Sequence, residues 1–171
     1  MKRIIGFLGA LALVAPVALE AQDTEWNRYT LEEIGGVYVS AAADATCEAA
    51  GISASSVQAD AAIKLLDGDV DLLTEEEMLA NPGLPELHIA LSCVQGSGNG
   101  FAYVVDVRVQ QAAQMIRDNQ VTLAEAVTWY TSAVGLVGAG EAQTALQGAI
   151  GEKLMQFAEA YTTANATDTG R

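Results

Sequence analysis

The sequence predicts an α+β two-layer sandwich, in which a long amphipathic carboxy-terminal helix packs on one face of a mostly antiparallel sheet. Two patterns carry this prediction. Apolar residues alternate with polar or small ones over residues 86–94, as in a half-buried strand, and they recur at helical spacing over residues 141–163. The expected order of elements is β-α-β-(α)-β-β-β-α.

The first strand and the first helix are expected before residue 68. Residues 37–41 are rich in β-forming residues and predict a short strand, which a loop or frayed turn over residues 44–51 follows. Ser53 is a suitable cap for a helix that runs to about Leu66, and Gly68 ends this helix.

A second short strand and a minor helix follow. Residues 70–73 predict the strand. Thr74 and Glu77 have the spacing of a capping box, which predicts a brief helix that ends before the Asn81-Pro82-Gly83 turn.

Three long antiparallel strands are expected next, over residues 86–94, 101–116 and 121–134. The glycine-rich segment 96–100 predicts the first hairpin turn. Residues 110–117 have helical propensity as well, but the equal lengths of the last two segments favour a long hairpin. Gly135 and Gly138 are expected to end the last strand.

The last helix has the strongest pattern, because its apolar residues form one continuous stripe that must lie across a sheet. The stripe consists of Ala142, Leu146, Ile150, Leu154, Phe157 and Tyr161.

The amino terminus reads as an export signal. Met1-Lys2-Arg3 is a charged start, residues 4–19 are apolar, and Ala21 offers a small residue for cleavage. The alternative is an uncleaved membrane anchor, but the apolar run is short for a bilayer and contains Pro16. We therefore expect a signal peptide over residues 1–21, a polar lead-in over 22–35, one α+β domain over 36–164, and a flexible tail over 165–171.

The charge balance excludes several classes of function. The chain has 22 acids and 8 bases, a net charge of −14. Removal of residues 1–21 takes away Lys2, Arg3 and Glu20 and leaves 21 acids against 6 bases, or −15. Such a chain lacks the clustered cations that nucleic acids or anionic lipids require. One histidine and two cysteines are too few for a usual zinc site, so we expect no metal and no cofactor.

Cys47 and Cys93 are the only cysteines, and in an oxidising compartment they are able to form a disulfide. The alternative is that both cysteines are free buried thiols, and a third hypothesis is that one of them is a reactive thiol. His88 lies five residues before Cys93, on the opposite face of the expected strand, which disfavours joint chemistry.

The acidic stretch around Asp67, Asp69, Asp71 and Glu75 resembles a calcium loop, but no frame places both the glycine and the bidentate acid correctly. Weak cation binding there remains an alternative to a solvated acidic surface.

Aromatic residues indicate a candidate partner surface. Trp129 and Tyr130 are adjacent on an expected strand, so one of them faces away from the core. Together with Tyr38 and Tyr103, the outward-facing residue marks a surface for another protein. The alternative is that it only covers a sheet edge.

Several segments of the chain resemble a family of small exported bacterial proteins that has no assigned function. These segments are Gly36-Val37-Tyr38-Val39-Ser40, Leu87-His88-Ile89-Ala90-Leu91, Gly100-Phe101-Ala102-Tyr103, Thr128-Trp129, Gly135-x-x-Gly138 and Phe157-x-x-Ala160-Tyr161 with Asn165. The element order is also similar to that of the TolB amino-terminal domain and of the lipopolysaccharide-assembly lipoprotein LptE. These resemblances imply binding or assembly and supply no catalytic residues.

We therefore expect an exported periplasmic domain that is not an enzyme, that has no stable membrane insertion after signal cleavage, and that contacts another envelope protein. A carrier of a small ligand or cation is the alternative, and a hydrolase or thiol enzyme is a third class. The oligomeric state does not follow from the sequence.

Overall fold

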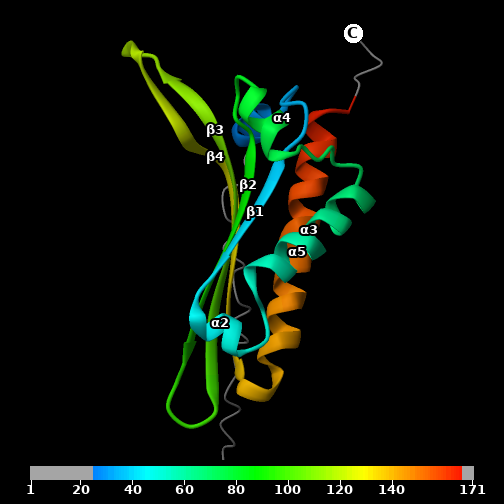
Figure 1. Ribbon diagram of the computed structural model, residues 1–171, viewed down its shortest axis with the longest axis vertical. Coiled ribbons are helices and arrows are strands. Elements are labelled where there is room, and N and C mark those ends of the chain that lie inside the picture. The colour runs from blue at the N-terminus through cyan, green and yellow to red at the C-terminus, as the bar shows by residue number, and fades with distance from the viewer. Residues whose placement is uncertain (1–24, 167–171) are drawn as a thin grey trace, which may run out of the picture.

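The computed structural model describes residues 25–166, which form one mixed four-stranded sheet with helices packed against it (Figure 1). The expected signal peptide, residues 1–21, lies outside the described residues, as do residues 22–24 of the lead-in and 167–171 of the tail. No helix within the described part is long and apolar enough to cross a membrane.

The sheet has the strand order β1-β2-β3-β4. β1 pairs with β2 in parallel, and the pairs β2–β3 and β3–β4 are antiparallel. The strands are β1 (Tyr38–Ala43), β2 (Glu86–Gln95), β3 (Gly100–Met115) and β4 (Asp118–Gly138). The helices are α1 (Glu25–Arg28), η1 (Tyr29–Leu31), α2 (Ala45–Ala49), α3 (Ala54–Asp67), α4 (Glu75–Ala80), η2 (Ala139–Glu141) and α5 (Ala142–Ala164).

The α+β class, the mostly antiparallel sheet and the long final helix are confirmed. Figure 1 shows the sheet nearly edge-on, with α3 and α5 side by side on one side of it. α3 contacts β1, while α5 contacts β3 and β4. The capping boxes at Ser53 and Thr74 also form, and they begin α3 and α4.

The expected strand over residues 70–73 is wrong. Only one residue of this segment, Leu72, makes a β-bridge, with Val37. The segment has no room for more, because Asp69 is still in a left-handed turn (φ 57°) and Thr74 already caps α4. The connection from β1 to β2 therefore contains only helices. One of them is α2, a short helix that occupies part of the segment 44–51 expected to be a loop or frayed turn.

The expected break of the last strand at Gly135 is also wrong, because β4 continues to Gly138. Gly135 pairs with Tyr103 of β3. A Cβ atom at position 135 would lie 2.2 Å from Cζ of the Tyr103 ring, so the ring occupies the space above the glycine. Coverage by an aromatic ring makes a glycine acceptable in a strand that otherwise loses packing there.

The core lies between the sheet and the helices α3 and α5. Its largest fully buried side chain is Trp129, whose ring meets Phe157 of α5 edge-on at a centroid distance of 5.3 Å. The fully buried Leu31 shows that the lead-in contributes to the core. Asn165, expected at the start of the flexible tail, accepts a hydrogen bond from the Glu33 amide and donates one to the Leu31 carbonyl.

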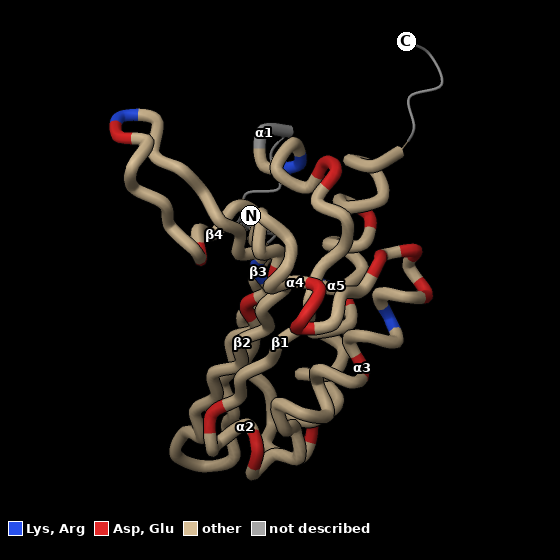
Figure 2. Tube along the Cα trace, turned by 45° about the horizontal axis from the view of Figure 1, so that its top comes forward, with Lys and Arg blue, Asp and Glu red and all other residues tan. Residues whose placement is uncertain are grey.

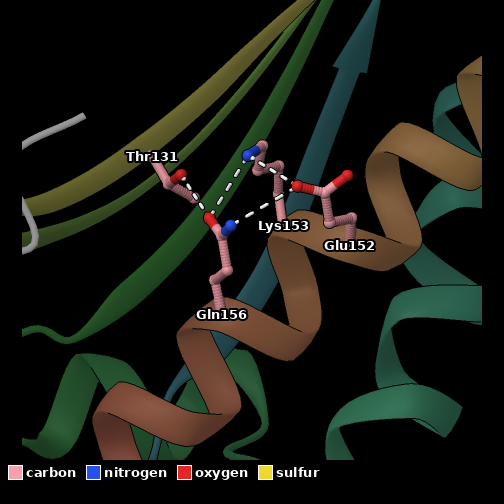
Figure 3. A network of polar contacts seen from close by, with 4 residues as sticks. All are labelled: Thr131, Glu152, Lys153 and Gln156. Carbon is pink, nitrogen blue, oxygen red and sulfur yellow. Dashed lines mark hydrogen bonds and ion pairs between the residues drawn. The ribbon is translucent and has the colours of Figure 1, made fainter. Parts of the chain in front are cut away.

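A polar network fixes α5 on β4 (Figure 3). Thr131 is the only buried polar residue among residues 27–166, and its hydroxyl donates to Oε1 of Gln156 at 2.8 Å. Lys153 Nζ donates to the same oxygen at 3.3 Å and pairs with Glu152 at 3.2 Å. The network satisfies Thr131 in the core, and we assign it a structural role.

The two edges of the sheet differ. At the β1 edge, the side-chain amide of Gln58 in α3 donates to the Val39 carbonyl at 2.7 Å, and Val37 bridges to Leu72 just before the strand begins. Within residues 25–166, no strand pairs with the far edge of β4. The hydroxyl of Thr30 donates to the carbonyl of Thr128 at 3.4 Å, so this part of β4 has a contact from the lead-in. We use the term free edge for the remaining residues of β4, 130–138.

Candidate functional site

The face of the sheet opposite α3 and α5, here called the outer face, is the candidate site. The strand register aligns its side chains in rows across the strands. One row consists of Ser40, His88, Arg108 and Tyr130, and the next consists of Ala42, Ala90, Asp106 and Ser132. None of these side chains is buried, whereas the other face of the same strands supplies ten of the 26 buried hydrophobic residues of the core.

A chain of hydrogen bonds orients the single histidine on this face. The Ser40 hydroxyl lies 2.5 Å from Oε1 of Glu86 and 2.7 Å from Nδ1 of His88. Because a hydroxyl has one proton and the carboxylate only accepts, Ser40 donates to Glu86 and accepts from Nδ1–H. This assignment places a proton on Nδ1 of His88.

This arrangement differs from a hydrolytic triad. In a triad the serine contacts Nε2 of the histidine and the acid contacts Nδ1. Here Ser40 and Glu86 both lie on the Nδ1 side of His88. The contacts therefore fix the orientation of the imidazole and lack the serine–Nε2 contact of a triad.

Two polar atoms beside His88 lack a hydrogen-bond partner. Arg108 is the β3 neighbour of His88 in the register, and Asp106 lies on the same face two residues earlier. Asp106 Oδ1 and Arg108 Nε are buried and unpaired, and no other buried side-chain polar atom in the described part of the chain is unpaired. Such atoms cost about 1–3 kcal/mol each when left without a hydrogen-bond partner.

An apolar patch adjoins these polar rows toward the β2–β3 turn. We use the term apolar patch for Val94, Ala102, Val104, Val134 and Leu136, which the register places in two neighbouring rows. Val134 and Leu136 are 79% and 78% exposed and Val94 is 66% exposed. Side chains of this kind are unusual as a contiguous group on a monomer, and they are typical of interaction surfaces.

The β3–β4 hairpin continues beyond Glu86, the first residue of β2, as a two-stranded arm, residues 111–127, which projects away from the helices (Figure 1). Gln111 anchors its base by donating to the Thr30 carbonyl and the Thr128 hydroxyl, each at 2.8 Å. Ile116 at the tip is fully exposed, and Leu123 is 46% exposed. The arm extends the exposed apolar area of the sheet.

The structure divides the four aromatic residues of the expected partner surface. Tyr38 and Tyr130 lie on the outer face, where both are partly exposed. Tyr103 lies on the helix side against Gly135, and Trp129 is completely buried. Trp129 and Tyr103 are therefore not part of an outer-face surface, because the alternation of the strands directs them toward the helices.

The disulfide between Cys47 and Cys93 joins α2 to β2, with the two Cα atoms 5.2 Å apart. Asp44 reinforces the same junction. Its carboxylate accepts from the backbone amides of Thr46 and Cys47 as the cap of α2, and from the Cys93 amide at 2.7 Å. These hydrogen bonds, that of Cys93 first, lower the pKa of Asp44.

The potential ligand groups of the described residues do not form a metal site. Their only set of three within 4.8 Å is Asp44 with the two sulfur atoms of Cys47 and Cys93. These sulfurs are bonded to each other, so they cannot act as thiolate ligands. Asp69 and Asp71 of the acidic stretch line an open hollow of about 400 Å³. Burial, and then the charge of Asp71, raises the pKa of Tyr161 beside them.

A cleft of about 350 Å³ lies between α3 and α5. Its lining is mixed: Val57, Ile150 and Leu154 are apolar, and Asp60 and Lys64 are charged. Within residues 25–166 no carboxylate lies within ion-pair distance of Lys64. The cleft has the size and lining of a site for a small molecule.

The charges are unevenly distributed (Figure 2). Residues 100–138, the β3–β4 hairpin, hold three acids and two bases, a net charge of −1. The whole chain carries −14, so all the other residues together carry −13. The hairpin is therefore a nearly neutral surface on a strongly acidic protein.

The fold and site together define a disulfide-linked α+β protein with an exposed sheet face. Neither the protein-family models nor the curated proteins that were compared include a match to this sequence.

Sequence reasoning missed the contacts among Ser40, Glu86 and His88. The alternation of residues 86–94 already places Glu86 and His88 on one face. The position of Ser40 depends on the parallel β1–β2 register, for which no local pattern exists.

Proposed function

We propose that this protein is an exported, non-catalytic binding module of the periplasm that contacts another envelope protein through the outer face of its sheet. The apolar patch carries the proposal, because it is an exposed apolar surface on a face that α3 and α5 do not cover.

The compartment rests on two observations. The amino-terminal sequence has the order of a secretory signal, and the Cys47–Cys93 disulfide is a feature of oxidising compartments. The resemblance to small exported bacterial proteins and to envelope assembly domains agrees with this assignment.

A matched pair of variants tests the proposal by chemical crosslinking in cells and mass spectrometry of a carboxy-terminally tagged protein. Val94→Asp places a carboxylate in the apolar patch, and Met155→Asp places one on α5 at nearly the same exposure, 66% against 65%. We expect the crosslinked sample to contain one dominant envelope protein. Val94→Asp should reduce the recovery of this protein about tenfold or more, because burying an unpaired carboxylate in the interface is costly. Met155→Asp should retain it.

Equal thermal unfolding of the two variants is the control for folding. Retention of the partner by Val94→Asp, its loss in Met155→Asp, or recovery of no envelope protein at all would contradict binding through the outer face.

The second candidate is a carrier of a small ligand, which the cleft between α3 and α5 favours. Lys64, which has no ion pair within residues 25–166, lines this cleft together with Val57, Ile150 and Leu154, and these groups suit a small carboxylate with an apolar tail, such as octanoate. A rise in melting temperature with octanoate that Lys64→Met abolishes would support the carrier function. The hypothesis of a cation carrier has no such support, because among the described residues the carboxylate oxygens of Glu33, Asp69 and Asp71 do not all lie within 4.8 Å of one another.

A further inference from the structure

We propose that two copies of this chain associate through the free edge of β4, residues 130–138, and join their four-stranded sheets into one continuous sheet. The contact uses the backbone of the edge strand and takes in only Val134 and Leu136 of the apolar patch. The rest of the outer face stays exposed for the partner proposed above.

The first argument is the composition of this edge. Native sheets protect their edges with charged residues, proline, bulges or a covering segment. Residues 130–138 contain no charged residue and no proline, and the bulges of β4 all lie before residue 130. The β1 edge, in contrast, is short and is covered by Gln58 and Leu72. An edge left open over nine residues is suited to pair with another strand.

The second argument is charge, and it indicates what the partner strand is. Two copies of this protein repel each other over most of their surface, because the residues outside the β3–β4 hairpin carry −13. The hairpin, at −1, is the surface through which two copies can approach with little repulsion. A second copy fits here without any change in the remaining surface.

The third argument is the symmetry of the pairing. Two identical strands pair edge to edge about a two-fold axis only in the antiparallel direction, and such dimers are the commonest oligomers. With the axis at Val134, the midpoint of the free edge, Val134 lies opposite itself and Ser132 lies opposite Leu136. The nearest charged residue of the strand, Glu125, falls opposite position 143, beyond β4. No two carboxylates of β4 then face each other.

The pairing also matches exposed apolar side chains. Val134 is 79% exposed in a single copy, and at the axis it contacts the same side chain of the second copy. The apolar patches of the two copies then adjoin across the axis.

Sedimentation analysis of the mature protein over a concentration series tests the proposal by charge exchange at the axis. The wild type should sediment as a dimer at high concentration. Val134→Asp alone and Val134→Lys alone should each weaken dimerisation about tenfold or more, because like charges meet at the axis. An equal mixture of the two should dimerise again, since opposite charges then meet.

The mixing step separates lost association from lost folding, because a misfolded variant is not restored by its counterpart. Val94→Asp, on the same face but on β2, is the matched control and should dimerise like the wild type. A monomeric wild type at every concentration, equal dimerisation of all the proteins, or a mixture that stays monomeric would each overturn the proposal.

Discussion

Replacement of Gly135 by alanine tests the packing of the β3–β4 hairpin. An alanine Cβ would lie 2.2 Å from Cζ, 2.4 Å from Cε1 and 2.4 Å from the hydroxyl oxygen of Tyr103. Since ordinary contacts are longer than about 3.4 Å, the ring must move by more than an ångström. Tyr103 packs against the core, so this movement costs packing on the helix side of the sheet.

The expected magnitude follows from two opposing effects. Overpacking of an ordered side chain costs about 1–3 kcal/mol. Alanine in place of glycine in a strand gains about 0.5–1 kcal/mol through the unfolded chain. We therefore expect Gly135→Ala to lower the free energy of unfolding by about 1–2 kcal/mol in the wild type and to raise it slightly in a Tyr103→Ala background.

Urea unfolding of the wild type, both single variants and the double variant gives the coupling energy directly. We expect a coupling of about 2 kcal/mol between the two positions. If Gly135→Ala is neutral in the wild type, or costs the same with and without Tyr103, the ring does not occupy the space above the glycine.

Three further predictions concern stability. The double variant Cys47→Ala/Cys93→Ala should lose about 4 kcal/mol of unfolding free energy by chain entropy for a separation of 46 residues, and no loss in urea unfolding would argue against the disulfide. Hydrogen bonds lower the pKa of Asp44 below its usual 3.8, so its contribution to the free energy of unfolding is present above that pH and is lost as the pH falls through the lower pKa of the folded state. Asp44→Asn should therefore reduce the loss of stability at acidic pH. An unchanged dependence of stability on pH would contradict the role of these hydrogen bonds. Leu146→Ala should cost about 2–5 kcal/mol in the same unfolding assay, while the exposed Met155→Ala changes it by less than about 0.5; equal effects would refute the burial pattern.

The elements that follow from the sequence are those with a local cause. The alternation in β2, the apolar stripe of α5, the Ser53 cap of α3 and the capping box of α4 are each set by neighbouring residues, and the sequence predicts each of them. The continuation of β4 through Gly135 is not predicted, because it depends on Tyr103 in another strand. Local rules describe a glycine as a break, whereas a cross-strand ring compensates for it.

The candidate site shows the same limit. The alternation of Trp129 and Tyr130 predicts that one of them faces away from the core, and the structure shows that it is Tyr130, but the sequence did not decide between the two. The row of Ser40, His88 and Arg108 joins three strands whose register is set by the whole sheet. Pairing of distant strands has no short-range signal, so such a row is visible only in the folded chain.

The covered β1 edge limits how many strands can be added to this sheet. Gln58 and Leu72 occupy the first part of this edge, at Val39 and Val37, so a strand added from a second copy or from another protein finds a long run of free backbone groups only on the β4 side. A sheet with two open sides can add molecules without end and grow into a fibre. With one side closed, growth terminates after a single addition, and the stoichiometry of strand addition is limited to one for each molecule.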